Sequence, residues 1–288
     1  MKPYNMQPKL SNWEKSLKSK NIIIAGGSTG LGKYLTFYLN SLGVNLGVFS
    51  RNIKESNFIN QFKSEKIFIE NVDICNSFDV HRFISNYYKK FKRIDGLINC
   101  AGVYGPMNKL ENMDRDEFIH SINVNLIGTF NVIKSCIPIF KEQNYGRVVQ
   151  LSGGGATSPM PQIYGYASSK AAVVRFIESI ALENSLGNIL INSVAPGALN
   201  TKMLKEVLDA GPDKVGEIFY EKALKQNESG GSSLENASRC ISYLVSPENK
   251  VITAKLISAV WDPWKEWAFG EKKPPNKETS KFTLRREI

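Results

Sequence analysis

The chain has 288 residues, 42% of them hydrophobic and 22% charged, a composition ordinary for a globular protein that forms one large α/β domain or two small ones. The formal net charge of +10 would suit anionic ligands, but the lysines and arginines are spread along the chain without a basic helix or a stacking-aromatic motif, so no nucleic-acid partner is expected. No run approaches the roughly 18 consecutive apolar residues of a membrane-spanning helix, and residues 1–20 lack an apolar signal core, so neither a membrane partner nor secretion is expected.

The first predicted element is a strand over Asn21–Ala25, followed by a glycine-rich turn and an amphipathic helix over 33–42. The glycines would let the turn fold tightly and let backbone N–H groups approach a pyrophosphate at the N-terminus of the helix. A plain turn is the alternative, but the position directly after a strand favours dinucleotide binding. The predicted cofactor turn consists of Gly26, Ser28, Thr29, Gly30, Leu31 and Gly32.

A second apolar strand over 44–49 ends at Ser50 and Arg51. A site that prefers NAD usually carries an acidic residue here, which binds the adenosine ribose hydroxyls. The planar guanidinium of Arg51 instead suits a 2′-phosphate, and this predicts NADP(H) as the cofactor. The alternative is that Arg51 is a solvent-facing loop cation.

Two further strands are predicted over 66–70 and 95–99, with an amphipathic helix over 77–91 between them. Because strands alternate with helices, we expect parallel pairing with right-handed crossovers, and hence a single doubly wound, Rossmann-type α/β sheet with helices on both faces. Ligand-binding loops of such a sheet lie at the carboxyl ends of its strands. Four candidate residues fall at these ends: Gly26, Arg51, Asp73 and Asn99.

A helix over 118–140 is expected to contain Asn125, a weak helix former that must cap, pack or take part in the chemistry. A strand over 145–152 runs into three glycines, and the next helix, to about residue 186, carries Tyr166 and Lys170. These side chains are four residues apart and so emerge on one helix face. The ammonium would lower the phenol pKa from about 10, giving a proton donor and acceptor near neutral pH. From spacing alone, an ordinary half-exposed pair is the alternative.

The remaining strands are expected over 188–194 and 255–260, with a helix over 233–245 between them. Residues 201–231 are polar and helical with glycine breaks, and they form either a mobile lid over a substrate or a surface insertion. No repeat or long linker separates two domains. The expected division is an N-terminal extension over 1–20, one dinucleotide-binding and catalytic domain over 21–260, and an aromatic, then polar tail over 261–288.

The four cysteines are scattered without Cys-x-x-Cys spacing, and the chain has only two histidines. Scattered cysteines indicate reduced thiols, as in a cytoplasmic protein, rather than a disulfide framework or a zinc site. Two histidines are few for a mechanism that depends on a histidine triad or on a metal bound by histidines. No metal site is therefore predicted.

Taken in order, these motifs resemble the short-chain dehydrogenase/reductase family over roughly residues 19–260. The resemblance implies that Tyr166 and Lys170 are the catalytic pair and also contact the cofactor, and that Asn125 holds a water of the proton relay. It assigns Asp73, with Ile74, to the adenine end of the dinucleotide. The other cofactor contacts that it implies are Ser50, Asn99, Ala101, Gly102, Pro196, Gly197 and Thr201.

The chain departs from the family pattern at two places. The catalytic serine usually lies thirteen residues before the tyrosine, a position that Gly153 occupies here. Ser152 is the expected substitute as a catalytic residue, with Ser158 or a substrate group as alternatives. The second departure follows the last strand, where residues 260–264, with two tryptophans, replace the family's usual glycine-rich segment. This segment is expected to alter the contact between subunits or to form a wall of the substrate cleft. We expect both tryptophans to be buried.

The predicted function is an NADP(H)-dependent oxidoreductase that interconverts a carbonyl and a secondary alcohol of a small molecule by hydride transfer. Two alternatives remain open: a dinucleotide-binding sensor or scaffold with weakened catalysis, and an enzyme that modifies a sugar nucleotide through transient oxidation. The family resemblance also implies a homodimer or homotetramer.

Overall fold

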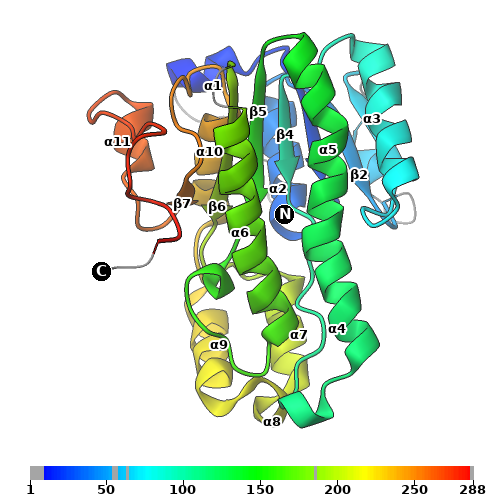
Figure 1. The fold of residues 1–288 in the computed structure, drawn as a ribbon, viewed down its shortest axis with the longest axis vertical. Helices are drawn as coiled ribbons and strands as arrows, with labels where there is room; N and C mark the ends of the chain where they lie inside the picture. Colours follow the sequence, from blue (N-terminus) through cyan, green and yellow to red (C-terminus); the bar gives the residue numbers. More distant parts are fainter. Residues whose placement is uncertain (1–9, 54–57, 63–64, 185–186, 286–288) are drawn as a thin grey trace.

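A parallel β-sheet forms the centre of the molecule (Figure 1). The computed structural model describes residues 10–53, 58–62, 65–184 and 187–285, and within them the strand order is β3-β2-β1-β4-β5-β6-β7. Each neighbouring pair is parallel, so the predicted doubly wound Rossmann-type sheet is confirmed. The strands are β1 (Asn21–Ala25), β2 (Asn45–Ser50), β3 (Ile67–Asn71), β4 (Gly96–Asn99), β5 (Gly146–Leu151), β6 (Ile189–Ala195) and β7 (Leu256–Ser258).

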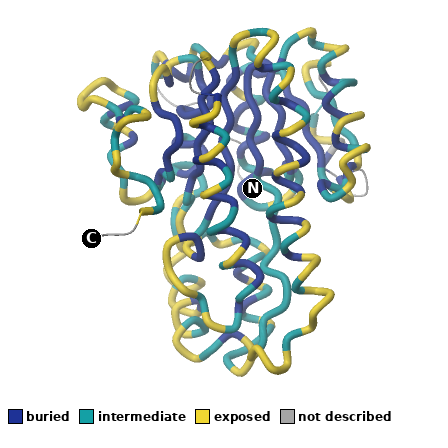
Figure 2. Tube along the Cα trace, viewed as in Figure 1, coloured by how far each residue is buried: buried dark blue, intermediate teal, exposed yellow. Residues whose placement is uncertain are grey.

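Helices cover both faces of the sheet, and the central strands β1, β4 and β5 are buried throughout, whereas the edge strand β3 is only partly buried (Figure 2). In β1, Ile22 and Ile24 join the core on one face, whereas Ile23 and Ala25 join the core on the other. This alternation follows from the two-residue period of a strand, and it explains the continuous apolar runs of the sequence. One face carries α2 (Gly30–Ser41) and α10 (Leu234–Val245); the other carries α3 (Ser77–Phe91), α5 (Gly128–Glu142) and α6 (Tyr164–Glu183).

The single helix expected over 118–140 is longer and is interrupted. It comprises α4 (Arg115–Ile122), the π-helical segment η3 (Asn123–Ile127) and α5. It begins early because the Asp114 carboxylate caps it, accepting a hydrogen bond from the Glu117 N–H at 2.8 Å. By length and composition alone, Arg115–Glu142 could cross a membrane. Its α5 part packs buried apolar side chains on the sheet instead, as a core helix does.

The N-terminal segment contributes a short helix that the pattern analysis missed, α1 (Asn12–Ser16). Its signal was present: Ser11 and Glu14 form a reciprocal capping box. Trp13 and Leu17 are buried in the core beside α10. The division of the chain at residues 20 and 260 stays a prediction.

Two further segments lie at the margins of the sheet (Figure 1). Beyond the carboxyl ends of the strands, residues 201–231, here called the lid segment, form α7 (Lys202–Ala210), α8 (Pro212–Val215) and α9 (Glu217–Ser229) around a small apolar core of their own. Beside β7 lie α11 (Trp264–Ala268) and the chain that follows it. The short 3-10 helices are η1 (Ile59–Gln61), η2 (Leu110–Asn112) and η4 (Gly154–Ala156).

Candidate active site

A cavity of about 700 Å³ opens at the carboxyl ends of the strands, beneath the lid segment. It collects predicted residues from four parts of the chain: the glycine turn after β1, the loop after β4, the end of β5 with α6, and the end of β6. The predicted residues that line it are Gly26, Thr29, Gly30, Leu31, Gly32, Gly102, Ser152, Tyr166, Lys170, Pro196, Gly197 and Thr201. The predicted residues outside its lining are Ser28, Ser50, Arg51, Asp73, Ile74, Asn99, Ala101 and Asn125.

The glycine turn is tight enough to exclude any side chain at two positions. A Cβ on Gly32 would lie 2.2 Å from the Gly26 carbonyl oxygen, and a Cβ on Gly26 would lie 2.7 Å from the Ala101 nitrogen. The helix α2 starts directly at this turn, and its N-cap residue Thr29 makes no side-chain capping bond. Backbone N–H groups of the first helical turn are thus available to an anion, which fits a dinucleotide pyrophosphate.

The ends of β2 and β3 lie on one side of the turn, opposite β4. The Ser50 and Ser28 hydroxyls lie 2.6 Å apart, which ties the end of β2 to the glycine turn. Arg51 is exposed in the turn that follows. The Asp73 carboxylate accepts a hydrogen bond from the Cys75 N–H at 2.9 Å, and Ile74 beside it is buried.

Asn99 and Asn125 do not line the cavity, but their side chains connect the elements that surround it. The fully buried Asn99 amide donates to Thr129 Oγ1 at 3.0 Å and to Gln150 Oε1 at 2.8 Å, and so joins β4, α5 and β5. Asn125, in the π-helical segment, donates to the Val103 carbonyl oxygen and to Ser169 Oγ, each at 2.9 Å, and accepts from the Val103 N–H. These bonds occupy both side chains and fix the loop after β4 against α6.

Tyr166 and Lys170 lie side by side on α6, with the Lys170 ammonium 5.6 Å from the centroid of the Tyr166 ring. Lys170 is 4% exposed and donates to the Leu151 carbonyl oxygen at 3.0 Å, which fixes α6 against the end of β5. Burial disfavours the ammonium and lowers the Lys170 pKa from its ordinary value of 10.5 to about 8.

The expected lowering of the Tyr166 pKa is wrong for this arrangement. Burial raises the pKa of the phenol above its ordinary value, and the neighbouring Tyr104, whose ring centroid lies 4.7 Å away, adds to the rise. The sequence could not indicate this effect, because Tyr104 comes from the loop after β4. At neutral pH Tyr166 is therefore a protonated phenol.

Gly153 lies directly at the phenol, and Ser152 precedes it after the end of β5. Ser152 is 4% exposed and lines the cavity, and its hydroxyl has no hydrogen-bond partner among the described residues. A Cβ on Gly153 would lie 2.2 Å from Tyr166 Oη, so the phenol occupies the space that a side chain at 153 would need. Ser158 is exposed and outside the cavity, so that alternative does not fit.

Several cavity residues were not predicted individually. The lid segment contributes Leu204 and Val207 of α7, whose apolar spacing was the available signal, and Phe219 of α9. The chain after β7 contributes Trp261 and Phe282, without any motif. The expectation that both tryptophans of residues 260–264 are buried is confirmed for Trp264 and is wrong for Trp261, which is 86% exposed.

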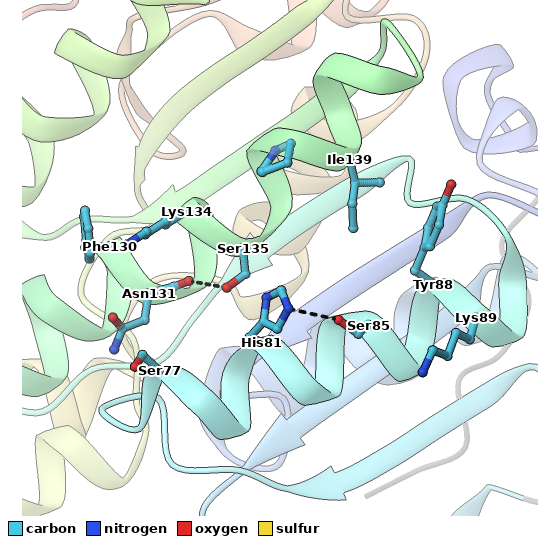
Figure 3. A pocket seen from close by; sticks show the side chains of 11 residues that line it. Ser77, His81, Ser85, Tyr88, Lys89, Phe130, Asn131, Lys134, Ser135 and Ile139 are labelled. Atoms are coloured by element: carbon cyan, nitrogen blue, oxygen red, sulfur yellow. Dashed lines mark hydrogen bonds between the residues drawn. The ribbon is translucent and has the colours of Figure 1, made fainter.

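A second cavity of about 710 Å³ lies between α3 and α5, away from the strand ends (Figure 3). Its polar side chains come from one face of each helix, and the Ser85 hydroxyl lies 3.4 Å from His81 Nε2. None of the predicted site residues lines it.

A glycine turn and a buried tyrosine–lysine pair that line one cavity of a doubly wound parallel sheet are features of a dinucleotide-binding α/β protein. Residues 20–211 match the family model described as short chain dehydrogenase. The chain is 27% identical to levodione reductase of Leifsonia aquatica over 245 residues, which cover 82% of this chain and 91% of that protein.

The chain is also similar to ipsdienol dehydrogenase of Ips pini, with 29% identity over 203 residues, covering 66% of this chain and 79% of that protein. Among solved structures, ElxO with NADP bound superposes with a TM-score of 0.72 at 27% identity, covering 84% of this chain and 97% of that chain. This protein belongs to the short-chain dehydrogenase/reductase family. It is an NAD(P)-dependent oxidoreductase that acts on CH–OH groups.

Proposed function

We propose that the protein is an NADP(H)-dependent oxidoreductase that reduces an apolar carbonyl compound to a secondary alcohol, with Tyr166 as the proton donor. The observation that carries the proposal is the joint burial of Tyr166, Lys170 and Ser152 in one cavity that also contains the glycine turn. Burying a polar group costs free energy unless the group is hydrogen-bonded, and the Ser152 hydroxyl has no partner among the described residues, so its burial in the cavity points to a ligand.

When bound, the nicotinamide supplies the hydride. Tyr166 holds its proton at Oη because burial raises its pKa, and it donates that proton to the oxygen of the substrate as the oxygen becomes an alkoxide. The Ser152 hydroxyl, which has no partner among the described residues, orients the carbonyl oxygen of the substrate. Lys170 places a buried positive charge beside the phenol and stabilises the phenolate left after proton transfer.

The preference for NADP(H) rests on Arg51 at the end of β2, where its exposed guanidinium suits a 2′-phosphate. ElxO, a similar protein, binds NADP. The glycine turn would hold the pyrophosphate, and Pro196, Gly197 and Thr201 at the end of β6 would border the nicotinamide.

The test is to mix the purified chain with NADPH or NADH and a set of cyclic ketones and to follow the loss of the reduced cofactor. We expect turnover with NADPH and a dissociation constant for NADPH at least about 10-fold below that for NADH. Equal affinity for the two cofactors would overturn the NADP preference. Failure to oxidise NADPH with any carbonyl compound would overturn the proposed reaction.

One observation favours a second candidate, a dinucleotide-binding sensor with weakened catalysis: Gly153 stands where the family's serine is expected. Tight NADPH binding without turnover would support the sensor. The homodimer or homotetramer, and the cytoplasmic location, stay predictions.

A further inference from the structure

The end of the chain runs along the free edge of β7, and residues 276–285 are called the C-terminal strap here. The Leu256 N–H, which points away from β6, donates to the Phe282 carbonyl oxygen at 2.7 Å. The buried Lys255 ammonium donates to the Thr279 carbonyl oxygen at 2.5 Å. The strap therefore lies beside the edge strand (Figure 1) and supplies hydrogen-bond partners to Leu256 of β7 and to the preceding Lys255.

The strap is also tied to the catalytic helix. The Leu284 N–H donates to Glu178 Oε1 at 2.8 Å, and Glu178 on α6 is only 4% exposed. Arg175, one turn earlier on α6, pairs with Glu178 at 2.7 Å and donates to the Leu284 carbonyl oxygen. Since α6 also carries Tyr166, these bonds set where the strap lies relative to the catalytic groups.

Phe282 is the strap residue held by contacts on several sides. Its backbone has a φ of +64°, a left-handed conformation that a bulky residue adopts only when its surroundings enforce it. Its ring packs edge to face on Trp267, with centroids 5.4 Å apart. Phe282 and the adjacent Thr283 both line the catalytic cavity.

The strand order indicates which ligand Phe282 faces. The glycine turn follows β1, Ser152 follows β5, and the strap borders β7, so the strap lies on the far side of the catalytic groups from the dinucleotide turn. Leu256 and Trp261 line the cavity on that side together with Phe282, and the lid segment adds the apolar Leu204 and Val207 to the lining of the same cavity. An apolar carbonyl compound fits this lining better than an anionic one.

We propose that Phe282 is a specificity-determining residue, which limits how far an apolar carbonyl substrate extends toward β7. The inference rests on the proposed function, because it presupposes a carbonyl substrate beside Tyr166. It goes beyond that function by assigning the size limit to one side chain of the C-terminal strap. Replacing the ring by a methyl group would open the cavity on the β7 side only.

The test compares Phe282→Ala with Phe269→Ala, a matched control whose ring is 53% exposed in the same tail and does not line the cavity. Each protein is given NADPH with cyclohexanone, 4-tert-butylcyclohexanone or the bicyclic 2-decalone. We expect Phe282→Ala to raise kcat/KM for 2-decalone relative to cyclohexanone by about 10-fold or more, because one methylene group in an apolar pocket already changes discrimination by that factor. The affinity for NADPH should change less than about twofold, since the glycine turn is remote.

Binding of the same ketones to the NADP⁺ complex, measured by calorimetry, separates the two proposals because it needs no turnover. If the wild-type protein reduces no ketone but Phe282→Ala still shifts the ratio of dissociation constants, the proposed function fails and the size limit stands. If Phe282→Ala and Phe269→Ala rank the ketones as the wild-type protein does, the inference is overturned. It is also overturned if none of the three ketones binds any form of the protein.

Discussion

The contact between Gly153 and Tyr166 makes a specific prediction about restoring a side chain at position 153. The minimal change is Gly153→Ala, whose Cβ would lie 2.2 Å from Tyr166 Oη, whereas real Cβ contacts essentially never fall below 3.0 Å. The phenol must therefore move by about 0.8 Å, the difference between these distances. A displacement of about 1 Å in a reacting group costs on the order of 100-fold in rate.

We expect Gly153→Ala to lower kcat/KM for ketone reduction by about 100-fold, with NADPH affinity unchanged within about twofold. Gly153→Ser, which brings back the hydroxyl found at this position in the family, should lose activity too, because it carries the same Cβ. Gly154→Ala is the matched control: its Cβ would have no atom within 4 Å, so activity should stay within about twofold of the wild-type protein. The assay is steady-state NADPH oxidation, with thermal unfolding to verify the fold. Wild-type or faster turnover by Gly153→Ser would refute the reasoning.

Three further predictions concern charged groups. The Lys170 pKa falls from 10.5 in the unfolded chain to about 8 in the folded protein, so between these pH values the unfolded state binds more protons than the folded state. The free energy of unfolding of the wild-type protein, relative to that of Lys170→Met, should therefore rise by about 3 kcal/mol from pH 8 to 10.5. A difference in urea-unfolding free energy that does not change with pH would contradict this. Arg51→Ala should weaken NADPH binding by about 10-fold and leave NADH binding unchanged, in contrast to the exposed control Arg115→Ala; equal losses for both cofactors in fluorescence titration would disprove the role of Arg51. Arg147 is 2% exposed and donates hydrogen bonds to three backbone carbonyl groups and to the Asn188 side chain, so Arg147→Met should cost about 3 kcal/mol of unfolding free energy, and a loss below about 1 kcal/mol would show that these acceptors find other partners.

Much of the fold could be predicted because its signals are local. The β1 run of apolar residues followed by a glycine turn is contiguous, and the strands alternate with amphipathic helices, so the parallel sheet follows. Tyr166 and Lys170 could be paired because four residues on a helix fix their common face. The turn glycines could be recognised because all of them lie in one short segment of the sequence, directly after a predicted strand.

The rest depended on contacts between distant segments. The raised Tyr166 pKa results from burial against Tyr104, which lies 62 positions earlier in the chain. The bond from Leu256 to Phe282 joins an edge strand to a polar tail that carries no periodic pattern. Ser152 was singled out by position, but its burial and the lack of a partner for its hydroxyl among the described residues are tertiary properties. The residue pattern of one segment does not show which of its side chains a distant segment of the chain will bury.

The most direct test of the central claim, that the Tyr166 phenol donates the proton in carbonyl reduction, is the rate of NADPH oxidation by Tyr166→Phe at saturating NADPH and ketone. Tyr164→Phe is the matched control, since Tyr164 lies on the same helix and does not line the cavity. We predict that Tyr166→Phe binds NADPH within a few-fold of the wild-type protein but loses at least about 100-fold in kcat, while Tyr164→Phe keeps its activity. Turnover by Tyr166→Phe at the wild-type rate would contradict the account.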